Sequence, residues 1–136
     1  MLIYADGTAL SRSLVPGPES ASWMRWSHEH AADLVTSPVG LTDLSRAADG
    51  LDAVARAKAH EVATTIEVVR FFDQSLEAAA MAASVLSPFR AMELGVAVAH
   101  PEIDRVATYD PLFARVAAIY GLEVVSPGRA AGWWDA

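Results

Sequence analysis

The stretch RVATYDPLFARVAAIYGLEVVSPG, residues 105–128, decides the fold. Its first part, residues 105–108, is short and β-branched, which predicts a buried strand. The segment 111–120 begins with proline and is largely apolar, so it predicts a helix that Gly121 ends. Residues 122–125 predict a second strand. A strand, a helix and a strand in this order form a parallel pair connected by a helix.

Working outward, the same alternation continues through the chain. Short apolar runs predict further strands at residues 2–5, 34–36 and 68–72. Amphipathic spacing and capping residues predict helices at residues 19–32, 38–49, 51–67, 75–85 and 88–99. Asp73 is expected to cap the helix that follows it. We therefore predict an α/β fold, a central parallel sheet with helices on both faces, over residues 1–128, followed by an irregular tail at 129–136.

The composition narrows the chemistry. A chain of 136 residues with 53% hydrophobic residues fits one domain with a real core. It has no cysteine, so a metal site would need carboxylate or histidine ligands. A net charge of −7 repels nucleic acid at long range, although bound divalent cations would reverse that sign locally. No long apolar stretch or signal-peptide pattern is present, so we expect no membrane contact and a cytoplasmic location.

Four acidic residues are candidates for a common site. Ligands of parallel sheets gather at the carboxyl ends of the strands, and Asp6 and Asp110 each follow a predicted strand there. Asp43 and Glu93 lie in helices that reach the same edge if those helices start there. Clustered carboxylates favour Mg²⁺ or Mn²⁺, which can activate water for phosphoryl displacement.

Each candidate also has a simpler explanation. Asp6 and Asp110 could only cap the helices that follow them, and Asp43 or Glu93 could be ordinary solvated helix residues. Those alternatives stay open from spacing alone. The histidines share no spacing with an acid, and surface positions are expected for His28, His30, His60 and His100. Core or interface packing, rather than base stacking, is expected for Trp23 and Trp26.

Three segments in this order resemble the PIN-domain ribonucleases of the VapC toxin type, over residues 1 to about 128. They are LIYADGTAL at 2–10, LVTSPVGLTDLSRAA at 34–48, and the stretch 105–128. The resemblance implies a PIN-like three-layer fold and a Mg²⁺- or Mn²⁺-dependent endoribonuclease that cleaves RNA with a metal-activated water. It implies metal ligation by Asp6, Asp43 and Asp110, and places Thr8 and Thr108 where they would position the water or a phosphate oxygen.

The same resemblance implies a biological setting. The chain would be the toxin of a type II toxin-antitoxin system, a homodimer silenced by a small antitoxin. The apolar helix faces near three aromatic residues are candidates for those protein contacts: Trp23, Trp26 and Phe72. Growth arrest on expression, relieved by the antitoxin, would be the expected phenotype.

One segment departs from the family pattern. Where the family has its third acid, FRAMELGVA at residues 89–97 has Arg90, which cannot bind a cation. Glu93 lies three residues on, on the same helical face, and we expect it to serve as the missing ligand. The competing expectation is that Arg90 pairs with a site carboxylate, leaving a catalytically impaired module that binds RNA or antitoxin without efficient cleavage.

The tripeptide Asp6-Gly7-Thr8 also occurs in haloacid-dehalogenase-type phosphatases. Those enzymes place a nucleophilic aspartate two residues before that acid, where this chain has Tyr4. The only lysine, Lys58, lies in a helical alanine-rich segment rather than after a strand. The sequence therefore argues against a phosphatase.

Overall fold

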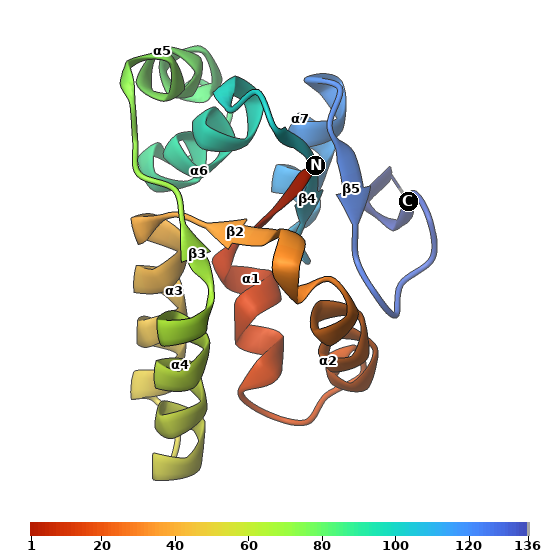
Figure 1. The fold of residues 1–136 in the computed structure, drawn as a ribbon. Coiled ribbons are helices and arrows are strands. Elements are labelled where there is room, and N and C mark those ends of the chain that lie inside the picture. Colours follow the sequence, from red (N-terminus) through yellow and green to blue (C-terminus); the bar gives the residue numbers. More distant parts are fainter. Residues whose placement is uncertain (136) are drawn as a thin grey trace.

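Five parallel strands form the central sheet, in the order β3-β2-β1-β4-β5 (Figure 1). The computed structural model describes residues 1–135. The strands are β1 (Leu2–Ala5), β2 (Leu34–Thr36), β3 (Glu67–Val68), β4 (Ile103–Ala107) and β5 (Glu123–Val125). The predicted α/β class with an all-parallel sheet is confirmed.

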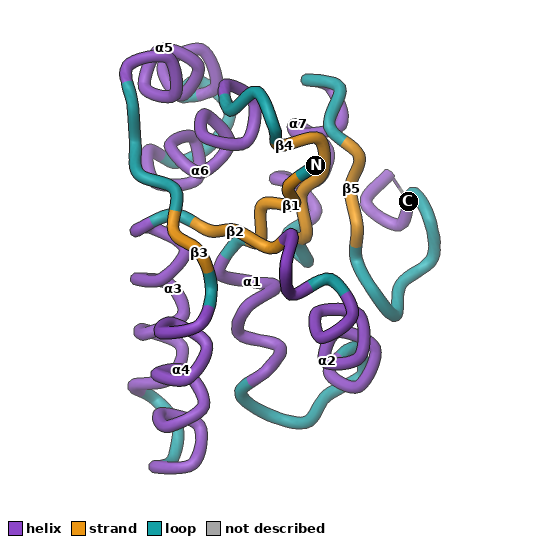
Figure 2. Tube along the Cα trace, viewed as in Figure 1, coloured by secondary structure: helices purple, strands orange, loops and turns teal. Residues whose placement is uncertain are grey.

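Helices cover both faces of this sheet, so the fold has three layers (Figure 2). One face carries α5 (Asp73–Ala82), α6 (Pro88–Ala99) and α7 (Pro111–Ile119). The other carries α1 (Gly7–Leu10), α2 (Ser20–Glu29), α3 (Pro38–Asp49) and α4 (Ala53–Thr65). Short 3₁₀ turns are formed by Ser11–Ser13, Ala31–Asp33 and Trp133–Asp135. The arrangement is consistent with a PIN-like three-layer fold.

The alternation of side chains along β1 divides the core in two. Ile3 packs into the cluster beneath α1 to α4, and its neighbour Tyr4 into the cluster beneath α5 to α7. Both residues are fully buried. Successive side chains of a strand point to opposite faces, so a central strand must be apolar on both sides. The tyrosine hydroxyl is the exception, and it lies close to the site described below.

The ends of β1, β2 and β4 lie at one edge because the strands run in register. Tyr4 pairs with Val35 of β2 and with Val106 of β4. A capping residue stands just beyond each strand and starts the next helix there, since it satisfies helix N–H groups that have no partner within the helix. These caps are Asp6 for α1, Ser37 for α3 and Asp110 for α7.

Several predicted boundaries are wrong. The strand expected at residues 68–72 is β3, only two residues long. The Val69 N–H still donates to the Thr36 carbonyl at 2.7 Å, but the chain then leaves the sheet, and Val69 and Phe71 pack against the core. Asp73 is not the cap of α5 but its first residue. Phe72 occupies the cap, and its backbone N–H is bound by the Ser75 hydroxyl.

Other helices are shorter than predicted. Asp52 caps α4, so the segment expected from residue 51 to 67 is helical only over Ala53–Thr65. The helix expected at 19–32 ends at Glu29 and continues as a 3₁₀ turn. The tail expected to be irregular contains another such turn, Trp133–Asp135. Over residues 1–135, none of the helices combines the length and the apolar character needed to cross a bilayer.

Candidate active centre at the carboxyl edge of the sheet

Asp6 lies at the middle of this edge and is fully buried. Its Oδ1 accepts hydrogen bonds from the backbone N–H of Ala9, at 3.0 Å, and from the Thr8 hydroxyl, at 2.6 Å. Its Oδ2 accepts from the Thr108 hydroxyl and, at 2.9 Å, from Nη2 of Arg90. Asp6 is therefore both a helix cap and a member of a charged cluster, so the two expectations for it do not exclude each other.

Asp110 divides its oxygens in the same way. Oδ1 caps α7 by accepting from the backbone N–H groups of Leu112, at 2.9 Å, and Phe113, at 3.2 Å. Oδ2 points to the centre and accepts from Nη2 of Arg90, at 2.7 Å. Asp110 is partly exposed, so this side of the cluster faces solvent.

Arg90, on α6, is the cation of the cluster. Nη2 serves both Asp6 and Asp110, while Nη1 donates to Oε2 of Glu93 at 2.7 Å. Burial by itself would lower the pKa of Arg90, but the negative charges of Asp6, Glu93 and Asp110 raise it. Its guanidinium also lies over the ring of Phe113, 4.5 Å from the centroid. Arg90 thus holds one positive charge among three acidic side chains.

Glu93 is the deepest acid, and both its oxygens have donors. Oε1 accepts from the Tyr4 hydroxyl at 2.9 Å, and Oε2 accepts from Arg90. The Tyr4 hydroxyl also forms a hydrogen bond of 2.8 Å with the Ser37 hydroxyl. Burial, and then the charge of Asp6, raise the pKa of Glu93 to about 7, although Arg90 and Tyr4 oppose that rise. Glu93 can therefore gain or lose a proton near neutral pH.

Asp43 lies at the rim, on α3. Its side chain packs directly over Gly7, where an added Cβ would collide with it. Burial raises the pKa of Asp43, the charge of Arg90 lowers it, and the charge of Asp6 raises it again. Its contact with Gly7, the residue after Asp6, places Asp43 beside the centre, although it makes no ion pair with any residue in the described range 1–135.

Two threonines link β1 to β4 around Asp6. Their hydroxyls both donate to Asp6 and lie 3.3 Å from each other. The Thr8 hydroxyl accepts from the backbone N–H of Tyr109, and the Thr108 hydroxyl accepts from that of Asp110. Each hydroxyl thus joins an acid to the neighbouring strand end, and the orientation of Asp6 is fixed from both sides.

The structure brings the predicted site residues into one region, but not as a ready metal site. Within residues 1–135, no group of three or more acidic or histidine side chains has a geometry that could hold a metal ion. Arg90 accounts for this, because its guanidinium lies between the carboxylates. The donor set itself consists of oxygens, which suit Mg²⁺ or Mn²⁺, so the residues fit such an ion once Arg90 leaves the Asp6 and Asp110 oxygens.

Sequence reasoning missed the Tyr4–Ser37 pair. The signal was present, since a tyrosine in a strand buried on both faces needs a hydrogen-bond partner for its hydroxyl. Among the aromatic residues, Trp23 is buried in the core as expected, while Trp26 is partly exposed and stacks on His30. The four histidines lie outside the cluster, at partly or fully exposed positions.

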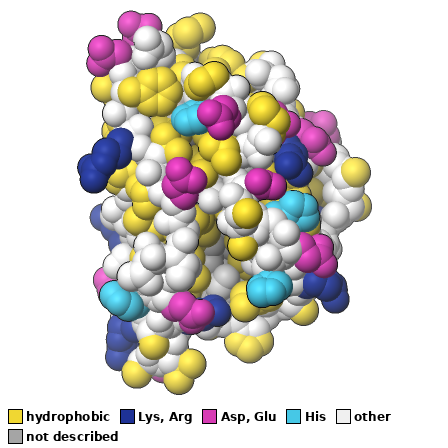
Figure 3. Space-filling model, in the orientation of Figure 1, with side chains coloured by type: hydrophobic (Ala, Val, Ile, Leu, Met, Phe, Trp, Pro, Cys, Tyr) yellow, Lys and Arg dark blue, Asp and Glu magenta, His cyan; other side chains and the backbone are white. Residues whose placement is uncertain are grey.

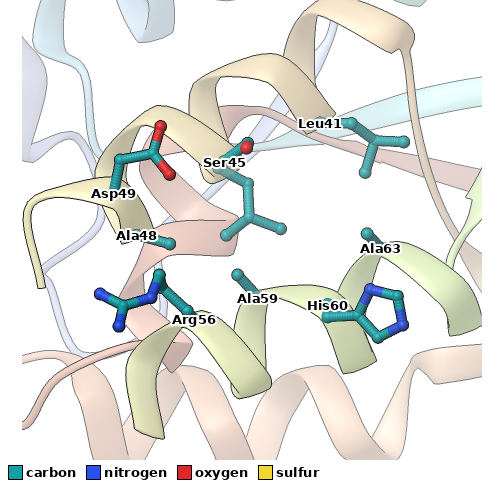
Figure 4. A pocket seen from close by; sticks show the side chains of 9 residues that line it. Leu41, Ser45, Ala48, Asp49, Arg56, Ala59, His60 and Ala63 are labelled. Carbon is teal, nitrogen blue, oxygen red and sulfur yellow. The ribbon is translucent and has the colours of Figure 1, made fainter. Parts of the chain in front are cut away.

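A separate hollow lies between α3 and α4 (Figure 4). It has a volume of about 220 Å³ and small side chains such as Ala59 and Ala63 along α4. Asp49 and Arg56 lie at one end. Because Asp43 and the other acids of the centre do not line this groove, it is a different surface from the candidate active centre.

Comparisons with protein-family models and with curated protein sequences give no match for this chain. The fold and the centre define its class by themselves: a three-layer α/β protein with a cluster of acids at the carboxyl edge of a parallel sheet.

Proposed function

We propose that this chain is a Mg²⁺- or Mn²⁺-dependent endoribonuclease of the PIN type, the toxin of a toxin-antitoxin pair. The observation that carries the proposal is the meeting of four acids, each from a different part of the chain, at the edge where parallel sheets bind ligands. The four are Asp6, Asp43, Glu93 and Asp110. Asp6 and Asp110 already hold a cationic nitrogen between them.

In this proposal the ion would be held by Asp6 and Asp110, with Asp43 and Glu93 completing the acidic set. When bound, the ion would supply Lewis-acid activation of a water for attack on an RNA phosphodiester. The chain's own residues prepare that position. Thr8 and Thr108 fix the Asp6 carboxylate through their hydroxyls, and Asp110 is fixed by its cap on α7. Fixed ligands need no reorganisation when the charge arrives.

Arg90 has a distinct part in the same proposal. Its Nη2 donates to the two carboxylate oxygens that the ion would need, so it competes with the ion for them. The partly exposed Arg90 therefore acts as a resident counter-ion that neutralises the acids until a divalent cation replaces it.

The partners follow from the family resemblance. They are an RNA substrate, a small antitoxin protein and a second copy of the chain, in the cytoplasm. One surface suits a protein contact, because hydrophobic side chains gather over α5 and α6 on the face shown in Figure 3. The exposed apolar residues of this hairpin region are Leu76, Met81, Val85 and Phe89. Exposed apolar patches commonly mark interaction surfaces.

A second candidate function is favoured by the Arg90 ion pairs themselves. If the guanidinium stays among the three carboxylates, the chain is an impaired PIN module that binds RNA or antitoxin without efficient cleavage. Breaking these contacts is costly because Asp6 and Glu93 are fully buried. The energy of ion binding must exceed that cost for the first candidate to hold.

Both candidates can be separated with purified protein. Mn²⁺ binding is measured by calorimetry, and cleavage of a structured RNA is measured in Mn²⁺ and in EDTA, for wild type, Asp6→Asn and the control Asp104→Asn. Asp104 is an exposed residue of β4 outside the centre. The nuclease proposal expects binding and cleavage by wild type and Asp104→Asn, and neither by Asp6→Asn. Wild type that binds RNA but neither binds Mn²⁺ nor cleaves supports the impaired module. Cleavage by Asp6→Asn at the wild-type rate contradicts the nuclease.

A further inference from the structure

Two arginines lie against the ring of Tyr109, the residue that precedes Asp110. The guanidinium carbon of Arg12 is 4.5 Å from the centroid of the Tyr109 ring, and that of Arg129 is 5.6 Å from it. Tyr109 directly precedes Asp110, and its backbone N–H donates to the Thr8 hydroxyl, which in turn binds the central acid. The two arginines therefore contact the neighbour of Asp110 in the sequence but belong to none of the ion pairs of the centre.

One buried carboxylate holds the pair together. Arg129 donates to Oε1 of Glu19 through Nε at 3.1 Å and Nη2 at 2.6 Å, whereas Nη2 of Arg12 lies 3.8 Å from the same oxygen. The hydrogen bond from Arg129 lowers the pKa of Glu19, so this acid is charged. A single negative charge thus faces two positive ones, and one positive charge is left in excess.

Arg12 is the arginine with donors to spare. Among residues 1–135 it makes the long ion pair with Glu19 and no side-chain hydrogen bond, and its side chain is 30% exposed. Arg12, Arg129 and Glu19 line a surface hollow of about 360 Å³. Arg129 is fixed by Glu19 and by stacking on Trp133, at 4.3 Å, so it shapes the hollow. The N–H groups of Arg12 remain available to a ligand that enters it.

We propose that Arg12, supported by Arg129, binds a backbone phosphate of a single-stranded RNA next to the phosphate that is cleaved at the acidic centre. This rests on the proposed ribonuclease function. The planar guanidinium suits phosphate oxygens, which accept two N–H bonds at once. A chain with a net charge of −7 repels RNA as a whole, so productive binding needs a local positive contact near the centre.

An RNA strand is favoured over an acidic protein segment by the regular spacing of its phosphates. Phosphates repeat at every nucleotide, so a strand with one phosphate at Asp110 necessarily carries the next one close by. Tyr109 is buried, so its ring supports Arg12 rather than stacking on a base. The contact is therefore with the backbone and carries no sequence preference.

The test measures RNA binding separately from cleavage. Binding of a short, labelled single-stranded RNA is followed by fluorescence anisotropy in EDTA at several salt concentrations, for wild type, Arg12→Gln and the control Arg25→Gln. Arg25 is exposed on α2 and makes no ion pair with any other residue from 1 to 135, so its variant loses the same charge elsewhere. Arg12→Lys tests whether the charge alone suffices, and circular dichroism checks folding.

We expect Arg12→Gln to weaken RNA binding roughly tenfold. The slope of log affinity against log salt should become shallower by about 0.7, the value for one phosphate contact on a single strand. Arg12→Lys should keep the wild-type slope, and Arg25→Gln should bind as wild type does. These results support the subsite even if Mn²⁺ induces no cleavage, an outcome that would overturn only the nuclease proposal.

Three results would overturn the subsite. The first is that wild type binds no RNA. The second is that Arg12→Gln and Arg25→Gln show equal slopes, including when wild type cleaves RNA normally in Mn²⁺. In the third case, Arg12→Gln leaves RNA binding intact but loses binding of a glutamate-rich peptide. That result would assign the hollow to an acidic protein segment.

Discussion

Asp6 and Asp110, at the ends of two adjacent strands, share a single nitrogen atom of Arg90. Nη2 lies 2.9 Å from Oδ2 of Asp6 and 2.7 Å from Oδ2 of Asp110. Each aspartate keeps its other oxygen for a helix N-terminus. The oxygens that remain for chemistry are therefore the two that Arg90 already occupies, and ion binding is coupled to the position of one side chain.

Replacing Arg90 with glutamine should strengthen Mn²⁺ binding while destabilising the metal-free protein. The substitution frees the oxygens of Asp6 and Asp110, but it leaves buried carboxylates without their counter-ion, which costs about 3–5 kcal/mol. Calorimetry should show higher Mn²⁺ affinity than wild type, and Mn²⁺ should raise the melting temperature of the variant by more than that of wild type.

The matched control for this variant is Arg105→Gln. Arg105 lies on β4 and pairs only with Asp104, at 3.6 Å, among the ion pairs of residues 1–135. Its loss should leave Mn²⁺ affinity unchanged. Equal or weaker Mn²⁺ binding by Arg90→Gln would show that Arg90 does not compete with the ion.

The stability of the metal-free protein should fall between about pH 4.5 and pH 7 through Glu93. Its pKa is raised from 4.5 to about 7 in the folded state, so over this range the folded protein keeps a proton that the unfolded chain releases. The contribution is fully present below the lower pKa and is lost as the pH rises through the upper one. It amounts to about 3 kcal/mol.

Denaturant unfolding at a series of pH values checks this. Glu93→Gln cannot titrate, so its stability should lack this loss between about pH 4.5 and pH 7. Mn²⁺ affinity of wild type should also rise as the pH passes through 7, because a carboxyl ligand must lose its proton to bind a metal. If the stability of wild type and that of Glu93→Gln changed with pH in the same way, the titration would belong to another group.

Tyr4→Phe should shift the pH dependence of Mn²⁺ binding upward. The Tyr4 hydroxyl donates to Oε1 of Glu93, a hydrogen bond that lowers the pKa of that acid, so its removal makes Glu93 harder to ionise. Leaving the oxygen without a partner also costs about 1–3 kcal/mol of stability. Tyr120→Phe is the control, since Tyr120 is exposed and outside the centre.

A pH profile distinguishes a positioning role from a merely structural one. A loss of stability alone, with the midpoint of the Mn²⁺ profile unchanged, would mean that Tyr4 only fills the core. An upward shift for Tyr4→Phe and none for Tyr120→Phe would assign it to the orientation and ionisation of Glu93.

Local signals determined which elements the sequence could predict. Both α3 and α6 begin where expected, because Ser-Pro pairs mark their starts at Ser37 and Ser87. The strand β1 has the predicted bounds, since its apolar run is ended by Asp6. By contrast, β3 lies at the edge of the sheet, and the apolar residues that follow it pack against the core. The apolar run at residues 68–72 therefore did not predict the length of the strand.

Asp6 and Asp110 could be predicted for the same reason, because strand ends and caps are local features. Asp43 and Glu93 lie inside helices and have no such local signal. What spacing could not show is how distant side chains meet. Tyr4 and Glu93 are 89 positions apart, and their hydrogen bond depends on how α6 is rotated against the sheet. The position of the Arg90 guanidinium between Asp6 and Asp110 depends on the same rotation. The sequence alone therefore allowed two expectations: that Glu93 replaces the missing ligand, or that Arg90 pairs with a site carboxylate.

The rotation of α6 is fixed in part by its close approach to α5, which gives a last prediction. A Cβ at Gly95 would collide with the backbone carbonyl of Ser75 and press on Ala79. Gly95→Ala should therefore destabilise the protein by about 1–3 kcal/mol through overpacking, and push α6, with Glu93, away from its place. Gly50→Ala is the matched control, since a Cβ there meets nothing within 4 Å and Gly50 has a negative φ. Denaturant unfolding should show a loss only for Gly95→Ala, and two variants of equal stability would mean that the α5–α6 contact can widen freely.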